Sequence, residues 1–450
     1  MPPDVDQLVD TCHPRHAAAA EHLLKQYAAI PRGAPVRLAK RTSNLFRPRE
    51  PQAGSGLDVA AFDQVLSVDP DARTADVQGM TTYEDLVDAT LPYGLMPLVV
   101  PQLKTITLGG AVTGLGIESS SFRRGMPHES VLEMDVLTGD GRVVTAQPQG
   151  EHRELFYGFP NSYGTLGYAL RLRIELEPTR PYVSLEHRRH GSLRSLVEDL
   201  VRVCATDADF VDAVVFAQDS AVVTVGRFAD AAPYTSDYTK DAIYYRSLLA
   251  RSHDYLTVRD YLWRWDTDWF WCSRGFGAQH PVLRRLWPRK YLRSNVYWQL
   301  AAAARRYRLT PRNTESVIQD VEVPAEQTEE LLTFLLREIP IRPIWLCPIK
   351  QRRPDVVWEL YSLDPHTLYV NAGFWSTMPR GVGEPDGLHN RNIELEVARL
   401  GGRKSLYSTA FYPEDEFWAT YNGSSYDVLK KTYDPDNRLL DLYAKAVGRR

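Results

Sequence analysis

Hydrophobic positions in the first third of the chain mostly alternate in short runs, and two segments have helical spacing instead. Val5 to Ala29 carries apolar residues at helical intervals and should end before Pro31. Residues 65–101 predict a strand, an Asp-Pro-Asp turn, a strand, a helix from Thr82 to Leu91 and a strand. A capping box from Thr81 to Glu84 should begin that helix. Short strands with few helices predict an α+β fold rather than a doubly wound sheet.

The pattern continues with strands in the middle of the chain and becomes more helical after it. Val131 to Val144 alternates and turns at Gly139-Asp140-Gly141, which is a hairpin signal. From about Tyr182 the pattern predicts βαβ-type units, and therefore a second domain. Its predicted helices are 192–204, 327–336 and 390–400, and its predicted strands are 210–216, 221–227, 317–324, 342–349 and 368–375.

Length, charge and cysteine spacing exclude several classes of protein. A chain of 450 residues is too long for one core, so two or three domains are expected. The net charge of −4 gives no reason to expect nucleic acid as a partner. Four cysteines, at 12, 204, 272 and 347, form no C-x-x-C pair, so neither a disulfide framework nor a zinc site is expected.

One stretch, Pro101 to Gly125, concentrates the glycines and serines of a ligand loop. Its five glycines allow backbone N–H groups to approach a ligand, and Ser119, Ser120 and Ser121 add hydroxyl donors. A pyrophosphate is the natural guest, and a purely structural loop is the alternative. The stretch matches neither a dinucleotide-binding G-x-G-x-x-G nor a P-loop, and we expect a turn with no helix after it.

The segment TLGGAVTGLGIESSS resembles the second FAD-pyrophosphate loop of vanillyl-alcohol-oxidase-type (PCMH-type) flavoproteins, in particular their Δ24-sterol reductase branch. Five further segments look like that branch in the same order: VLEMDVLTGDGRVV, ELFYGFPNSYGTLGYALRLRIELEPTRPYV, VIQDVEVP, PIWLCP and DEFW. Bacterial flavoproteins that reduce a methylene-branched fatty acyl chain are similar too. The resemblance implies a two-subdomain FAD-binding domain over residues 1–181, an α+β cap domain over 182–405, and a return to the first domain over 406–450.

The resemblance also implies noncovalent FAD, because the loops that match the family's FAD loops contain neither His nor Cys. The first pyrophosphate loop would lie at Thr42-Ser43-Asn44, where a basic surface turn is the alternative. A turn near residue 164 would touch the flavin. The residues expected to bind the cofactor are Thr42, Ser43, Asn44, Thr107, Leu108, Gly109, Gly110, Gly114, Gly116, Ile117, Glu118, Ser119, Ser120, Ser121, Gly164, Thr165 and Gly167.

A segment from Tyr255 to Arg308 mixes aromatic residues with arginines, including Arg284, Arg285 and Arg289. Such a mixture suits a membrane interface, and ordinary cap packing with a solvated basic face is the alternative. No apolar run reaches the length of a membrane helix, and no signal peptide begins the chain. We therefore expect a cytoplasmic protein that contacts the inner face of the membrane peripherally.

The implied chemistry is reduction of an isolated C=C bond in a lipid, with NADPH as one electron donor. Such an alkene needs a hydride on one carbon and a proton on the other, and a branched alkene best carries the developing charge. We rank a methylene-branched fatty acyl chain, made by a methyltransferase, slightly ahead of a Δ24-sterol. An alcohol or lactone oxidase and a flavin-free lipid-binding protein are the alternatives. Candidate proton donors are Glu118, Tyr261, Asp320, Glu359 and Tyr369.

Overall fold

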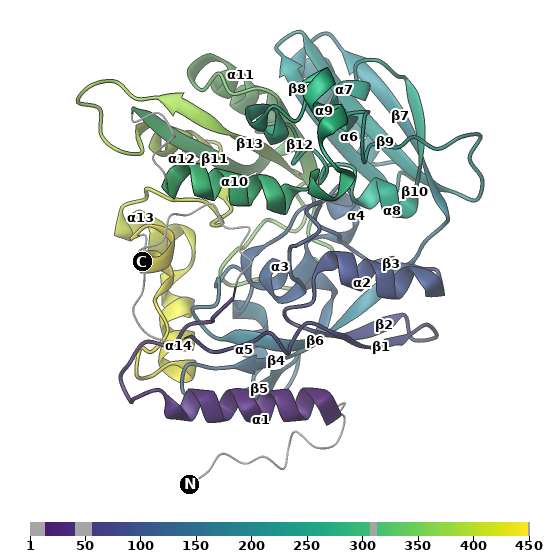
Figure 1. Ribbon diagram of the computed structural model, residues 1–450. Helices are drawn as coiled ribbons and strands as arrows, with labels where there is room; N and C mark the ends of the chain where they lie inside the picture. Colours follow the sequence, from purple (N-terminus) through teal and green to yellow (C-terminus); the bar gives the residue numbers. More distant parts are fainter. Residues whose placement is uncertain (1–13, 41–55, 307–312, 449–450) are drawn as a thin grey trace.

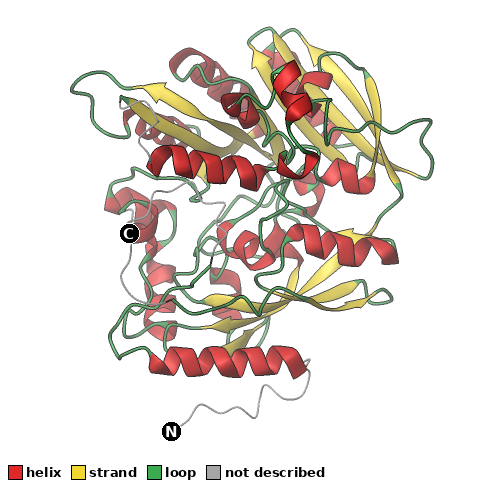
Figure 2. Ribbon diagram, viewed as in Figure 1, coloured by secondary structure: helices red, strands yellow, loops and turns green. Residues whose placement is uncertain are grey.

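The structure, a computed structural model, describes residues 14–40, 56–306 and 313–448 (Figure 1). It contains two sheets, one above the other in this view, with helices around both (Figure 2). All strand pairs within the two sheets are antiparallel. Helices and antiparallel strands mixed in this way confirm the predicted α+β class.

The lower sheet has the strand order β1-β2-β6-β4-β5, and β3 also pairs with β6. Its centre is the long strand β6, whose residues Leu172 and Ile174 are buried in the core on one face of the sheet. On the other face Arg171 is also buried, and it pairs with acidic residues of β2 and β4. The strands are β1 Val65–Asp69, β2 Thr74–Gln78, β3 Leu95–Pro97, β4 Val131–Leu137, β5 Val143–Ala146 and β6 Tyr168–Pro178.

Local signals placed most elements of the lower part correctly. The hairpin predicted at Gly139-Asp140-Gly141 is confirmed, because β4 and β5 pair on either side of it. The capping box at Thr81 is wrong by one residue, since the Thr82 hydroxyl accepts from the Asp85 N–H and begins the helix. The helices are α1 Pro14–Ala29, α2 Tyr83–Thr90, α3 Leu108–Gly114, α4 Ser121–Arg124 and α5 Arg153–Gly158. Of the predicted first helix, residues 5–13 lie outside the described residues.

The upper sheet has the order β10-β7-β9-β8-β12-β13-β11-β14. Helix α6 joins β7 to β8 and α11 joins β11 to β12, but in both cases a third strand lies between the two. The predicted βαβ-type units are therefore split units, and two copies of this β-α-β-β arrangement meet where β8 pairs with β12. The strands are β7 Tyr182–His190, β8 Phe210–Ala217, β9 Ser220–Ala229, β10 His253–Thr257, β11 Thr314–Pro324, β12 Ile344–Ile349, β13 Tyr369–Pro379 and β14 Arg403–Lys404.

The aromatic segment after β10 is largely core rather than surface. Tyr261, Trp263, Trp265, Phe270 and Trp271 are buried, and they belong to the same hydrophobic cluster as the strands around them. This corrects the interpretation of these rings as a membrane interface in favour of ordinary cap packing. The helices of the upper part are α6 Leu193–Cys204, α7 Tyr244–Ser247, α8 Val258–Leu262, α9 Pro281–Leu286, α10 Ser294–Arg306, α11 Thr328–Glu338 and α12 Leu388–Arg399.

The C-terminal segment leaves the upper sheet after β14 and packs against the lower part of the molecule (Figure 1). The ammonium group of Lys430 donates to the Thr165 carbonyl, and the Asp140 N–H donates to the Tyr433 carbonyl. Its helices are α13 Glu414–Thr420, α14 Gly423–Tyr433 and α15 Leu442–Ala446. The domain boundaries at 181 and 405 stay a proposal, which the change of sheet after β6 and the end of β14 support.

Candidate functional site

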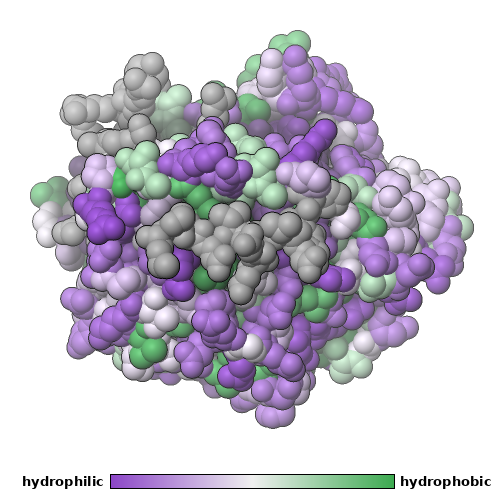
Figure 3. Space-filling model, turned by 90° about the horizontal axis from the view of Figure 1, so that it is seen from below, coloured by the Kyte–Doolittle hydropathy of each residue, from purple (hydrophilic) through white to green (hydrophobic). Residues whose placement is uncertain are grey.

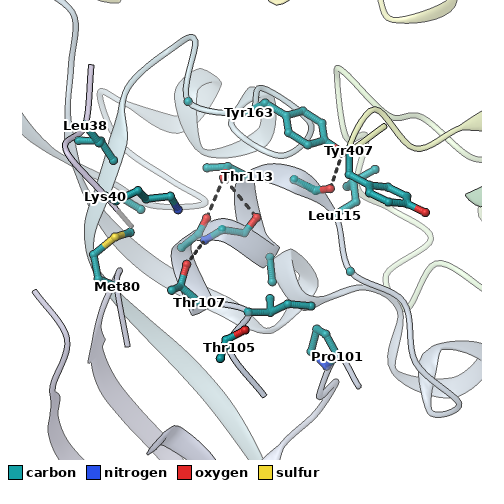
Figure 4. Close-up of a pocket in the computed structure, with 18 of the residues that line it drawn as sticks. Leu38, Lys40, Met80, Pro101, Thr105, Thr107, Thr113, Leu115, Tyr163 and Tyr407 are labelled. Carbon is teal, nitrogen blue, oxygen red and sulfur yellow. Dashed lines mark hydrogen bonds between the residues drawn. The ribbon is translucent and has the colours of Figure 1, made fainter. Parts of the chain in front are cut away.

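A cavity of about 580 Å³ lies between the lower part of the molecule and the upper sheet. Its volume is in the range that protein ligand sites occupy. The lower part contributes α3, the residues on either side of it, the turn before β6 and the segment 35–40. The upper part contributes aromatic residues, one carboxylate and the chain after β14. Figure 4 shows α3 in the middle, with Leu38 and Lys40 on one side and Tyr163 and Tyr407 on the other.

The glycine-rich stretch begins as a helix, which corrects the expectation of a turn. Three of the seven residues in α3 are glycine, and glycine disfavours a helix by about 1 kcal/mol each. Two threonines offset this cost. The Thr107 hydroxyl caps the Gly110 N–H at 3.2 Å, and the Thr113 hydroxyl donates to the Gly109 carbonyl at 2.8 Å (Figure 4). The lack of a side chain at Gly109 serves packing, since a Cβ there would lie 2.7 Å from the Gly79 carbonyl.

Past α3 the chain turns sharply and offers unused donors to the cavity. Leu115 adopts φ +60°, a conformation that is uncommon for a leucine and is found disproportionately at functional sites. The next two amide N–H groups, of Gly116 and Ile117, make no hydrogen bond within the described part of the chain, and both residues line the cavity. Adjacent free N–H groups in a turn form an anion site.

Basic side chains surround the same part of the cavity. Arg37, Lys40 and Lys445 line it, and the Lys445 ammonium donates to the Tyr163 carbonyl at 2.6 Å. Among the described residues that line the cavity, the single carboxylate is Asp320. The excess of positive charge suits a diphosphate. The predicted first loop, Thr42-Ser43-Asn44, lies outside the described residues, directly after the segment that carries Arg37 and Lys40.

The turn before β6 braces α3 from the other side. The Tyr163 hydroxyl donates to the Gly114 carbonyl at 2.6 Å, and the Tyr163 N–H donates to the Thr113 carbonyl. Gly164 and Gly167 line the cavity as predicted for a flavin-contacting turn, but Thr165 is buried and its hydroxyl donates to the Ser162 carbonyl.

The second half of the glycine-rich stretch turns away from the cavity. Ser120 donates to the Leu98 carbonyl, and Ser121 accepts from the Glu118 N–H. Ser119 bonds to both Glu118 and the Tyr261 hydroxyl, at 2.5 and 2.8 Å. None of these residues lines the cavity, and neither does Leu108, which is in the core. Of the predicted cofactor-binding residues described in the structure, the cavity wall therefore includes Thr107, Gly109, Gly110, Gly114, Gly116, Ile117, Gly164 and Gly167.

Two predicted proton donors, Glu118 and Tyr261, meet in a buried network with Arg264. The Arg264 guanidinium donates to Glu118 at 3.1 Å and to Asp212 at 2.8 Å. Burial raises the pKa of Glu118, while the positive charge of Arg264 opposes that rise. The network joins the glycine-rich stretch to the upper sheet, so these groups hold the two parts together away from the cavity.

Asp320 is the predicted proton donor that the structure brings to the cavity. It is a partly buried residue of β11, and it lines the cavity. Burial raises the pKa of Asp320 to about 7, while hydrogen bonds from Asn371 and Tyr407 partly offset the rise. The Asn371 amide donates to its Oδ1 at 2.9 Å, and the Tyr407 hydroxyl accepts from the Trp375 indole at 2.8 Å. A carboxyl group with this pKa can hold a proton near neutral pH and release it.

The other two predicted donors lie elsewhere. Tyr369 is buried at the start of β13, where its hydroxyl accepts from the Asp364 N–H. Glu359 accepts from Asn422 and Ser425 of the C-terminal segment. Neither lines the cavity. Tyr407, by contrast, was not anticipated, because no motif surrounds it and only the fold brings it beside Asp320.

Four aromatic side chains form the apolar wall of the cavity around Asp320: Trp269, Phe270, Trp345 and Trp375. The ring of Phe270 lies 4.4 Å from that of Trp375 and 5.5 Å from that of Trp345, measured between centroids. Trp269 and Phe270 both have positive φ, at +45° and +60°, which is rare for bulky residues. Backbone strain of this kind is found mostly at functional sites, which supports the assignment of this wall to the site.

These features fit FAD. The amides of Gly116 and Ile117 and the basic side chains suit its diphosphate, and the aromatic wall suits a planar ring system and an apolar substrate. Glycine at position 110 keeps this side of α3 open to the cavity, because a Cβ there would meet only the Thr107 hydroxyl.

Comparisons with known proteins support FAD as the cofactor. A family model described as "FAD binding domain" matches residues 12–147, which include α3 and the turn after it. The Δ24-sterol reductase of Mus musculus is 27% identical over 417 residues, covering 86% of this chain and 75% of the mouse protein. The Δ24-sterol reductase homolog of Caenorhabditis elegans is 26% identical over 429 residues, covering 86% and 78%.

A shorter similarity is confined to one part of the chain. Cytokinin dehydrogenase 5 of Arabidopsis thaliana is 33% identical over 132 residues, which are 29% of this chain and 24% of that protein. The similarity to the reductases spans most of the chain instead. The chain is therefore an FAD-dependent oxidoreductase similar to the Δ24-sterol reductases.

Proposed function

We propose that the protein reduces an isolated C=C bond in a lipid, with Asp320 as the proton donor. The observation that carries the proposal is the position of Asp320, a carboxyl group with a pKa of about 7 on an aromatic cavity wall opposite the FAD-binding turn. The names of the similar proteins support the reaction type, and their similarity extends over both sheets.

An isolated alkene dictates what the protein must supply. No carbonyl accepts charge as hydride adds, so a proton must reach the neighbouring carbon as the first C–H bond forms. FAD, when bound in its reduced form, supplies the hydride and its two electrons. The two hydrogens convert C=C to CH–CH, and Asp320 is left as a carboxylate that solvent reprotonates.

The residues around Asp320 prepare it for this role. Burial beside the aromatic wall raises the pKa of the Asp320 carboxyl group to about 7, so about half of the protein carries the proton at pH 7. Hydrogen bonds from Asn371 and Tyr407 stabilise the carboxylate that forms when Asp320 gives up its proton. Trp375 donates to the Tyr407 oxygen, which orients that hydroxyl.

For the substrate, the similar proteins favour a Δ24-sterol over the methylene-branched acyl chain that the sequence ranked first. We keep both as substrates to test, because each is a branched alkene that gives a tertiary centre. The acyl chain would require a methyltransferase to supply it.

NADPH as the electron donor is part of the same proposal. So is noncovalent FAD, since the described residues of the cavity wall include neither His nor Cys.

The test is anaerobic reduction of the flavin followed by addition of each alkene. Oxidation of the flavin with formation of the saturated product, and deuterium from heavy water on the protonated carbon, is expected for the true substrate. An enzyme that ignores both alkenes but reoxidises rapidly in air while turning over an alcohol or lactone would be an oxidase instead. A protein isolated without any flavin would support the lipid-binding alternative.

A further inference from the structure

We propose that α9 and the turn after it, residues 281–291, form a docking surface for an anionic lipid bilayer. This inference rests on the proposed function, in which the lipid substrate would come from the bilayer.

Apolar side chains are concentrated on α9 and face solvent. Val282, Leu283 and Leu286 are 61%, 47% and 74% exposed, and Tyr291 follows at 45%. Three large apolar residues within one six-residue helix are a patch, not isolated exposed residues. By contrast, the face seen from below is mostly hydrophilic, with apolar residues scattered over it (Figure 3).

The segment of chain that contains α9 carries basic residues and no acidic ones. Between Asp268 and Glu315 the sequence has ten Lys or Arg residues and no Asp or Glu. Three of them, Arg274, Arg285 and Lys290, are exposed and form no ion pair with any described residue. Arg284 and Arg289, which the sequence suggested as membrane contacts, are paired with Asp268 and Asp237 instead, and Arg284 is buried. An apolar helix with unpaired basic neighbours is complementary to an anionic bilayer.

The inner side of this segment leads to the cavity. Ala278, Leu292 and Tyr297 form a small core of their own, and Trp287 and Phe276 pack against it. Trp269 packs against the same core and lines the cavity. Trp287, at the C-terminal end of α9, therefore packs on the same small core as Trp269 of the cavity wall. This core connects the end of α9 to the aromatic wall.

The probe is sedimentation with vesicles of phosphatidylcholine, with or without one third phosphatidylglycerol. The wild-type holoenzyme should bind the anionic vesicles, and binding should weaken between about 0.1 M and 1 M salt as the screening length falls from about 10 to 3 Å. Val282→Ser with Leu286→Ser should lower the partition coefficient at least about tenfold. Arg285→Ser with Lys290→Ser should lower it by about fivefold for each charge and remove most of the salt dependence.

Matched controls lie on α14. Val428 is 57% exposed there, and Lys431 is exposed and without an ion pair among the described residues. Val428→Ser and Lys431→Ser should leave vesicle binding unchanged. Circular dichroism and flavin content verify that each variant is folded and loaded with cofactor.

Three results would overturn the proposal: no binding of the wild type to anionic vesicles, equal losses in the α14 controls, or a self-association in solution that the α9 changes abolish. The last would make α9 a contact between copies of the chain. Binding that depends on α9, from a protein that reduces neither alkene, would leave the docking surface standing and overturn the proposed reaction instead. With both correct, the α9 variants should retain turnover of a detergent-dispersed substrate and lose it with a vesicle-borne one.

Discussion

Replacing Asp320 by Asn tests the proposed proton donor and its environment together. Asn is close in size and keeps a polar group beside Asn371 and Tyr407, but it has no proton to give. We expect the single-turnover rate of alkene reduction to fall by about 10²–10⁴, the usual contribution of a positioned acid. Flavin content should not change, because Asp320 lies on the upper sheet, whereas the turn with the unused amides of Gly116 and Ile117 belongs to the lower part.

The same substitution should stabilise the protein above neutral pH. The pKa of Asp320 is raised from 3.8 to about 7, so the unfolded chain loses its proton first as pH rises. The stability that this group contributes is present below pH 3.8 and is lost by about pH 7. The difference of about 3 pKa units corresponds to about 4 kcal/mol as an upper bound. The Asn variant avoids that loss, so its advantage should grow between pH 4 and pH 7.

The assay is anaerobic stopped flow with prereduced flavin, followed by thermal unfolding at several pH values. For the wild type, the rate should fall tenfold per pH unit above about pH 7 as the donor form disappears. Glu322→Gln is the matched control, because Glu322 is on the same strand, burial raises its pKa to about 8, and it lies off the cavity wall. That variant should gain stability at high pH and keep its rate. A full rate in the Asp320 variant, or a flat profile from pH 6 to 9, would refute the assignment.

Three further predictions address the neighbouring groups. Tyr407→Phe should move the fall in rate to higher pH, because the lost hydrogen bond holds the pKa of Asp320 down; an unchanged profile would argue against this contact. Gly110→Val should give a folded but colourless protein, measured by flavin absorbance, whereas Gly191→Val, at a position with open space, should stay yellow. Arg264→Met should destabilise the protein by about 3–5 kcal/mol in urea unfolding, because Glu118 and Asp212 lose their shared cation; Arg194→Met, from an exposed pair, should cost at most about 1 kcal/mol.

The sequence predicted the elements well because their signals are local. Alternation and the Gly139-Asp140-Gly141 turn placed the hairpin of β4 and β5, and a threonine cap placed the start of α2 within one residue. The prediction failed for α3, where three glycines argued against a helix. A threonine cap and the close contact between Gly109 and Gly79 override that preference, and the partner at position 79 cannot be read from the loop itself.

Only part of the candidate site could be predicted from the sequence. The glycines and Asp320 could be named from motifs, but which groups share a cavity depends on strand order. Asp320, Trp345, Trp375 and Tyr407 come from four segments that the upper sheet and its continuation bring together. The three serines look like phosphate donors in sequence, yet hydrogen bonds to Leu98, Glu118 and Tyr261 occupy them in the fold.

The two β-α-β-β units of the upper sheet contribute different groups to the molecule. Strands of the second copy, β11 to β13, carry Asp320, Trp345 and Trp375, whereas β8 of the first copy carries Asp212, which binds Arg264. Trp345 connects them, since its indole donates to Asp212 at 3.2 Å. The second copy therefore forms the cavity wall, and the first copy forms the joint to the glycine-rich stretch. Changes at Asp320 or Trp375 would alter the space for the substrate and leave the ion pairs of Arg264 in place, whereas a change at Trp345 would affect both.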